Sequence, residues 1–184
     1  MSTVMNRKSL EVIKYANTPD FDKSQWIINP DLSKVQSVPK KYWMVRGDEV
    51  IPVTEQARKN MDEAEIGKLK EERYVDFEKN TINAVLQGFE YPAGSGTKVS
   101  IGEEDRLTLF GLCQLTMSPE TYPVTINNRH GGKITLNNQG DVQTLFKTDL
   151  ANRLNVQKAE LELKRRVRES QTIEAVKFVA DRRV

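Results

Sequence analysis

Residues 141–169 read DVQTLFKTDLANRLNVQKAELELKRRVRE, and this stretch decides the fold because its apolar residues recur every three or four positions. Such spacing predicts a long amphipathic helix, with Asp141 as its N-cap. Two apolar stripes follow the helix, one of Leu150, Leu154 and Leu161, the other of Val156, Ala159, Leu163 and Val167. A helix that is apolar on two sides needs two packing partners. We expect one partner to be a small sheet, and the other to be either a final helix over 172–181 or the same helix of a neighbouring subunit.

The segments that precede this helix predict two short hairpins. Residues 89–91 and 98–101 can pair across a proline- and glycine-rich turn, and the alternating segments 122–126 and 133–136 flank a glycine-containing loop. A short helix is expected between the two hairpins. Residues 89–184 are therefore predicted to form a compact α+β module of short antiparallel strands packed on helices.

Residues 42–88 predict a hairpin followed by a long helix. In Tyr42–Val53, two apolar segments lie on either side of a Gly-Asp turn. Thr54 then suits the N-cap of a helix that extends to about Leu86, and Gly88 ends that helix.

Residues 1–41 contain short apolar groups separated by prolines, and no helix or strand period persists there. We expect an extended N-terminal arm that cannot make a core of its own. Two interpretations remain open: a flexible leader, or an arm that becomes ordered against a partner subunit. In the second, the partner-binding residues are Tyr15, Phe21, Trp26, Ile27 and Ile28 of the arm, with Val156, Leu163 and Val167 of the long helix.

The composition describes a globular chain with a polar surface, since 38% of the residues are hydrophobic and 29% are charged. A formal charge of +2 is too small to attract nucleic acid or an anionic membrane from a distance. Cys113 is the only cysteine, so an intrachain disulfide is impossible. No apolar run approaches the roughly 18 residues that a membrane-spanning helix needs.

The candidate catalytic motifs each lack a required part. His130 is the only histidine, which excludes a two-histidine phosphatase pocket and a His-Glu-x-x-His metal site. In Gly94–Lys98 the threonine precedes the lysine, the reverse of the order in a phosphate loop. The carboxylates of residues 103–105 are accounted for by the first turn of a helix. We expect no catalytic, cofactor-binding or metal-binding residue and no enzyme activity.

The stretch Lys41-Tyr42-Trp43-Met44-Val45-Arg46-Gly47-Asp48-Glu49-Val50, followed by Pro52-Val53-Thr54-Glu55-Gln56-Ala57, resembles a cassette that recurs in bacteriophage proteins. The cassette consists of a Tyr-Trp strand, a Gly-Asp turn, a second strand and a helix that starts with Met-Thr-x-x-Glu. Val53 stands where the cassette has methionine.

Residues 72–184 are similar to a domain of unknown function in tail-fibre and baseplate-associated proteins of tailed phages. The parallels are Phe89-Glu90-Tyr91, Asp105-Arg106-Leu107, Val124-Thr125-Ile126, Gly132-Lys133-Ile134-Thr135-Leu136 and the closing stretch Glu169-Ser170-Gln171-Thr172-Ile173-Glu174-Ala175-Val176. These motifs are structural, and the family has no active-site residues to compare.

The resemblance implies a structural or docking component of a phage virion, in the tail, baseplate, fibre-attachment or neck region. Such a protein is made in the cytoplasm of the bacterial host, binds other virion proteins, and forms a trimer or ring, because phage tails have threefold, sixfold and twelvefold axes. Two alternatives stay open. One is a tail-assembly chaperone that is absent from the virion, and the other is a nucleic-acid-binding regulator that uses the basic run at residues 164–168.

Overall fold

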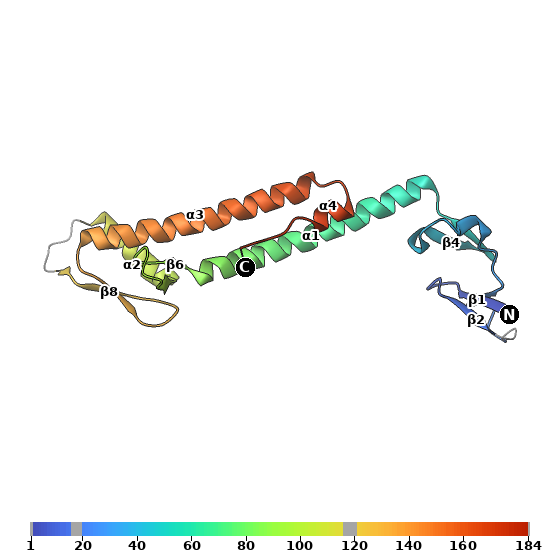
Figure 1. Cartoon of the computed structure of the whole chain (residues 1–184), viewed down its shortest axis with the longest axis horizontal. Helices are drawn as coiled ribbons and strands as arrows, with labels where there is room; N and C mark the ends of the chain where they lie inside the picture. The colour runs from blue at the N-terminus through green and yellow to red at the C-terminus, as the bar shows by residue number, and fades with distance from the viewer. Residues whose placement is uncertain (1, 16–19, 116–120, 184) are drawn as a thin grey trace. The chain divides into compact units, whose positions relative to one another are not determined.

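The computed structural model describes residues 2–15, 20–115 and 121–183, and it confirms the predicted α+β class (Figure 1). The chain divides into two compact units, Met1–Glu65 and Ile66–Val184. Helix α1 (Glu55–Gln87) begins in the first unit and ends in the second.

The N-terminal unit contains a three-stranded antiparallel sheet, so the prediction of an extended arm is wrong. Its strands are β1 (Ser2–Asn6), β2 (Val12–Tyr15) and β3 (Trp26–Ile28), in the order β2-β1-β3. Met5 lies opposite Val12 on one side and Ile27 on the other. The sequence does not predict this sheet, because its strands have only three to five residues. In β1 the expected alternation of buried and exposed side chains is also absent: Val4 and Met5 face opposite sides of the sheet, yet both are buried.

The sheet shares a core with the residues that follow it. Four buried side chains form this core: Met5, Ile27, Val35 and Val50. Val35 ends the short 3-10 helix η1 (Ser33–Val35), and a second one, η2 (Lys40–Tyr42), leads into the next strand. Because Val50 comes from the predicted hairpin, the core crosses the expected boundary at residue 41.

The predicted hairpin and helix start are confirmed. Strands β4 (Trp43–Arg46) and β5 (Glu49–Pro52) pair with the turn at Gly47-Asp48. The Thr54 hydroxyl accepts a hydrogen bond from the backbone N–H of Ala57 at 3.2 Å, as an N-cap does. In the first half of α1, Asp62 and Glu65 accept hydrogen bonds from the Lys41 ammonium at 2.8 and 2.9 Å, which joins η2 to the helix.

The second unit contains the predicted module of two hairpins and a short helix. Its elements are β6 (Phe89–Glu90), β7 (Lys98–Val99), α2 (Glu103–Gln114), β8 (Val124–Asn127), β9 (Lys133–Leu136) and the first turns of α3 (Gln139–Glu169). They enclose a core of Phe89, Val99, Ile101, Leu109, Ile126, Leu136, Val142 and Leu145. Gly88 enters the module at φ +73°, and a Cβ there would lie 1.9 Å from the carbonyl oxygen of Val99, so only glycine fits.

Helix α3 begins three residues earlier than a helix capped by Asp141 would. Asn138 is the N-cap, and its side chain accepts a hydrogen bond from the backbone N–H of Asp141 at 3.0 Å. The Asp141 carboxylate in turn accepts one from the N–H of Asn137 at 2.8 Å. The side chains of Asn138 and Asp141 thus each accept a hydrogen bond from a backbone N–H at the start of the helix. Both residues therefore suit an N-cap in the sequence, and the prediction selected Asp141 instead of Asn138.

A buried carboxylate joins α2 to α3. Asp149 is 3% exposed, and its Oδ2 accepts hydrogen bonds from the Nε atoms of Arg106 and Arg153, both at 3.0 Å. Both guanidinium groups also donate to the carbonyl oxygen of Ile101, at 3.2 and 3.5 Å. This carboxylate is therefore paired twice, which compensates the cost of burying its charge.

The C-terminal half of α3 packs against α1 and against the chain's final segment, which includes α4 (Ile173–Lys177) (Figure 1). Five buried side chains form this second core: Phe77, Leu163, Val167, Val176 and Val179. Of the two partners considered for α3, the final segment is the one observed, although its helix is shorter than expected. Leu163 and Val167 are therefore buried within the chain, and their assignment to partner binding is wrong.

Arg183 fastens the final segment to α1 and α3. Its guanidinium donates to Thr81 Oγ1 at 2.7 Å and to the carbonyl oxygens of Phe77 and Val156 at 3.2 and 3.3 Å. It also pairs with Asp181 at 2.6 Å, and this hydrogen bond lowers the pKa of the Asp181 carboxyl to about 2. The charged pair is held among backbone carbonyls rather than in open water.

Acid should weaken the attachment of the final segment to α1 and α3, because it protonates Asp181. Because the pKa of Asp181 is depressed in the folded state, its contribution is fully present above pH 3.8 and disappears as the pH falls through about 2. At pH 7 we expect Asp181→Asn to lower the free energy of unfolding of the second unit by about 2 kcal/mol. Urea unfolding of both proteins at pH 7 and near pH 2 tests this, since the difference should vanish in acid. An equal difference at both pH values would contradict the account.

Removal of residues 1–41 should expose the hairpin while sparing the second unit. Val50 and the ring of Trp43 would lose their neighbours, whereas the cores of the second unit contain no residue before Ile66. In the truncated chain Trp43 is the only tryptophan, so its fluorescence should shift to the red relative to full-length Trp26→Phe, which keeps Trp43 alone. Circular dichroism should retain the helical signal. An unshifted emission would show that the hairpin does not need the sheet.

Candidate docking site in the N-terminal unit

Strand β3 presents an open edge. Among the described residues it pairs only with β1, in the register Met5 opposite Ile27. The N–H of Asn29 donates to the Thr3 carbonyl at 2.6 Å, and the N–H of Arg7 donates to the Gln25 carbonyl at 2.9 Å. Because facing groups alternate along an antiparallel strand, the N–H and C=O of Ile28 point away from β1. These groups can pair with an added strand.

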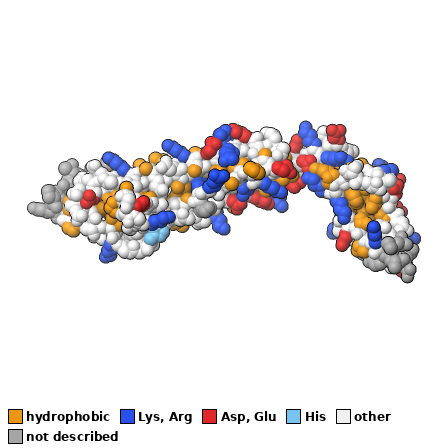
Figure 2. Space-filling view, in the orientation of Figure 1, with side chains coloured by type: hydrophobic (Ala, Val, Ile, Leu, Met, Phe, Trp, Pro, Cys, Tyr) orange, Lys and Arg blue, Asp and Glu red, His pale blue; other side chains and the backbone are white. Residues whose placement is uncertain are grey.

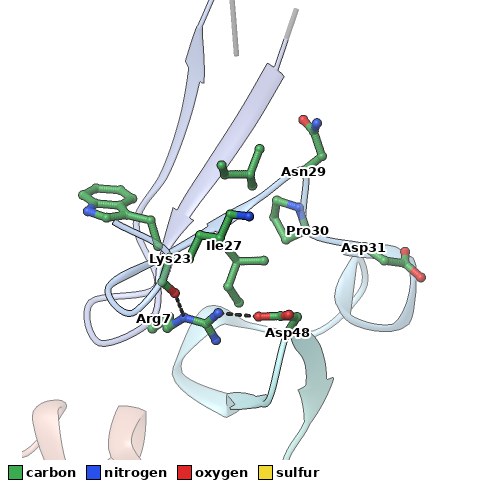
Figure 3. Close-up of a pocket in the computed structure, with 9 residues that line it drawn as sticks. Arg7, Lys23, Ile27, Asn29, Pro30, Asp31 and Asp48 are labelled. Atoms are coloured by element: carbon green, nitrogen blue, oxygen red, sulfur yellow. Dashed lines mark hydrogen bonds and ion pairs between the residues drawn. The ribbon is translucent and has the colours of Figure 1, made fainter. Parts of the chain in front are cut away.

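A hollow of about 450 Å³ lies along this edge (Figure 3). It is lined by consecutive residues of β3 and the loop after it, and by three residues from elsewhere: Trp26, Ile27, Ile28, Asn29, Pro30, Asp31, Arg7, Lys23 and Asp48. In Figure 3, Asn29 and Pro30 lie on one side of the hollow, and Arg7 and Asp48 on the other. We call this hollow the β3 groove.

Arg7 holds the wall opposite Asn29 and Pro30. Its Nε donates to the Lys23 carbonyl at 2.9 Å, one terminal nitrogen donates to the Gly47 carbonyl, and the other pairs with the Asp48 carboxylate. A single guanidinium thus joins the end of β1, the loop before β3 and the turn between β4 and β5. Its planar set of donors suits three acceptors in different directions, which a lysine could not satisfy together.

The groove carries charge of opposite sign at its two ends. Lys23 is exposed before β3, and Asp31 is exposed after it. A hydrogen bond with Ser33 holds the pKa of the Asp31 carboxyl below its usual range, so this residue is negatively charged at neutral pH. A bound segment would therefore be favoured with an acidic group near Lys23 and a basic group near Asp31.

An aromatic pair borders the groove. The rings of Phe21 and Trp26 lie 4.8 Å apart between centroids and are tilted by 30°. Both side chains are half-buried. Aromatic residues in such positions provide much of the binding energy at protein interfaces.

The residues that the sequence predicted for partner binding lie in different surroundings in the structure. Trp26 and Ile28 line the groove, and Phe21 supports Trp26. Ile27 also lines the groove, but its side chain is only 4% exposed and belongs to the core. The side chain of Tyr15 lies outside the described residues, and Val156 is half-buried beside Arg183. Arg7, Lys23 and Asp31 were missed, since no local pattern shows that residues so far apart meet.

The first apolar stripe of α3 remains on the surface. Leu150, Leu154 and Leu161 are 45%, 45% and 67% exposed, whereas the second stripe faces α1 and the final segment. One apolar side of α3 is thus covered within the chain, and the other has no cover among the described residues, so its packing against a neighbouring subunit stays a prediction.

The motifs weighed for chemistry occupy structural positions. His130 lies in the exposed loop between β8 and β9, and its Nε2 is 3.0 Å from the carbonyl oxygen of Gln87. Residues 103–105 occupy the first turn of α2. In the part of the chain that the structure describes, no three His, Cys, Asp or Glu residues are arranged to hold a metal ion.

Acidic neighbours pair with two of the four basic residues in the run at residues 164–168. Lys164 pairs with Glu78 and Glu160, both at 2.8 Å. Arg165 pairs with Glu162 at 2.7 Å and with Glu169 at 2.8 Å. Figure 2 shows acidic and basic side chains intermixed around α4 and the adjoining part of α1. Such a surface lacks the uniform positive field that attracts nucleic acid.

Comparisons with known proteins do not assign a family. No family model matches the sequence, and no curated protein or solved structure is significantly similar to it. Within the described ranges, no helix combines the length and the apolar composition needed to cross a membrane.

Arg7→Lys should loosen the wall of the β3 groove. Lysine can replace one of the three hydrogen bonds at best, so we expect the N-terminal unit to lose about 1–3 kcal/mol of stability. Amide hydrogen exchange at residues 47–49 should become faster. Arg46→Lys is the matched control, because Arg46 is exposed on the same hairpin and should be insensitive. Equal exchange in the two variants would contradict the role of Arg7.

Proposed function

We propose that this protein is a non-catalytic docking component of a tailed-bacteriophage virion that binds a partner subunit through the β3 groove. The assignment to phage rests on the resemblance of residues 41–57 and 72–184 to phage proteins. The docking role rests on one observation above all: an open strand edge lies beside a half-buried aromatic pair in a unit with its own core.

The partner in this proposal contributes an extended segment. An extended peptide can add to an open sheet edge through backbone hydrogen bonds, while its alternate side chains enter neighbouring pockets. Ile28 offers the backbone groups, and Trp26 offers apolar surface on the side of the sheet away from the core. The charges of Lys23 and Asp31 would set the direction of the segment.

The position within a virion and the symmetry of the assembly are also part of the proposal. The exposed stripe of Leu150, Leu154 and Leu161 supports contact with further subunits, because surface patches of large apolar side chains commonly mark interfaces. A trimer or ring would place this stripe repeatedly around one axis.

Quantitative mass spectrometry of purified particles from the phage that encodes this protein tests the proposal. We expect the wild-type protein in the particles, and we expect Trp26→Ala and Lys23→Glu to reduce its copy number severalfold, because both change the groove. Met44→Ala is the matched control: Met44 is 40% exposed in the same unit but does not line the groove.

Three outcomes would contradict the proposal in different ways. Absence of the wild-type protein from particles, with abundance in infected cells, would identify an assembly chaperone instead. Normal incorporation of both groove variants would reject the groove as the docking site. Salt-dependent binding of the free protein to DNA or RNA would favour the regulator, which the pairing of Lys164 and Arg165 with acidic neighbours disfavours.

A further inference from the structure

Helix α1 carries an apolar stripe on its exposed side. Val75, Ile82 and Leu86 are 64%, 60% and 41% exposed, and we call them the α1 stripe. The same turns of the helix bury Phe77 and Ala84. Because an α-helix has 3.6 residues per turn, the α1 stripe projects from the face opposite to these two buried residues. Its large side chains therefore lie outside the core that α1 shares with α3 and the final segment.

One ion pair shows that the α1 stripe and the leucine stripe of α3 lie on the same face of the helix pair. The Lys164 ammonium pairs with the Glu78 carboxylate across the two helices at 2.8 Å. Residues three or four positions apart are neighbours on the surface of a helix. Glu78 therefore adjoins Val75 and Ile82 of the α1 stripe, and Lys164 adjoins Leu161 of the leucine stripe. The two stripes thus border the same ion pair from either side.

The final segment covers the opposite face of this helix pair. The Asn80 amide donates to the Asp181 carboxylate at 3.2 Å, and the Arg73 guanidinium donates to the carbonyl oxygen of Val179 at 2.5 Å. Asn80 and Arg73 both lie on the side of α1 away from the α1 stripe. The helix pair therefore has one face that is packed within the chain, and one face whose two apolar stripes have no cover among the described residues.

The helix surfaces that carry the two stripes differ in the sign of their charge. Residues 71–86 of α1 include four acidic and two basic side chains, whereas residues 150–165 of α3 include four basic and two acidic ones. Contact between two α1 surfaces, or between two α3 surfaces, would bring like net charge together, whereas contact of α1 with α3 brings opposite net charge together. Each stripe also extends over about three helical turns, or about 16 Å, so the two match in length. The surface that matches each stripe best is therefore the other stripe.

We infer that the face formed by the α1 stripe and the leucine stripe binds a second copy of this chain across a twofold axis parallel to the helices. Such an axis places α1 of each copy on α3 of the other in antiparallel orientation, so two identical contacts form between apolar stripes of complementary charge. Since α1 and α3 already pack against each other within the chain, the dimer would be held by a bundle of four helices. The inference rests on the assembly role in the proposed function and assigns an occupant to the leucine stripe, while the β3 groove takes no part in it.

Sedimentation equilibrium of the full chain tests the inference. We expect a dimer with Kd on the order of 10 µM. Ile82→Glu and Leu154→Glu should each weaken it about tenfold or more, because each substitution places a carboxylate in both apolar contacts of the dimer. The circular dichroism should not change, since both side chains are exposed in the single chain. Phe178→Glu is the matched control, because Phe178 is 87% exposed on the final segment and lies outside both stripes.

Crosslinking tests the pairing of α1 with α3. Cys113→Ser removes the only native cysteine, and Leu86→Cys and Leu154→Cys are then prepared as separate proteins in that background. A short bismaleimide should link the two variants when they are mixed, and should link neither variant to itself. Crosslinked dimers of either variant alone would overturn the pairing of α1 with α3, as would the absence of mixed dimers from a protein that sediments as a dimer.

Two results would overturn the inference as a whole. One is a wild-type protein that stays monomeric at about 1 mM, and the other is dimerisation of Ile82→Glu and Leu154→Glu with the Kd of the wild type. Trp26→Ala should dimerise as the wild type does, because Trp26 belongs to the other unit. A monomeric protein that still enters particles would therefore reject this inference alone, whereas a dimeric protein that is absent from particles would reject the proposed function alone.

Discussion

The N-terminal unit depends on the pairing of β1 with two strands at once. Because β1 lies between β2 and β3, every interstrand hydrogen bond of this sheet involves it, and Met5 extends from β1 into the core that also buries Val50. The groove follows from the same strand. β1 holds β3 in place, and Arg7, the next residue after β1, fixes the turn that forms the opposite wall. Loss of β1 would therefore remove the core and the β3 groove together.

In the second unit, the two halves of α3 have different partners. Its first turns complete the core of the hairpin module, where the doubly paired carboxylate of Asp149 joins α3 to α2. Its last turns pack through Leu163 and Val167 on α1 and the final segment. Both partners take the same side of the helix, which leaves the stripe of Leu150, Leu154 and Leu161 exposed. Large apolar side chains of this unit thus remain exposed on α3, in that leucine stripe, and after α4, at Phe178.

The elements with strong local signals could be predicted from the sequence, and those that depend on distant partners could not. The Gly-Asp hairpin, the cap at Thr54, the stop at Gly88 and the long helix each have a signal within a few residues. The N-terminal sheet has no such signal, because β3 has three residues and gains its identity only opposite Met5 and Val4. Trp26 was predicted to be a contact residue because a bulky ring stands out in a polar segment, and it lines the β3 groove. Arg7, Lys23 and Asp31 were not, because only the folded chain brings them to one groove.

We conclude that the N-terminal unit folds around its own core and presents a preformed groove, rather than becoming ordered on a partner. Amide hydrogen exchange of the free protein tests this most directly at Met5 and Ile27, whose backbones face each other within the sheet. The account predicts slow exchange at both amides in the absence of any partner, with protection that is lost on removal of the sheet. Exchange at the rate of an unstructured chain in the free protein, with protection only in the assembled particle, would contradict it.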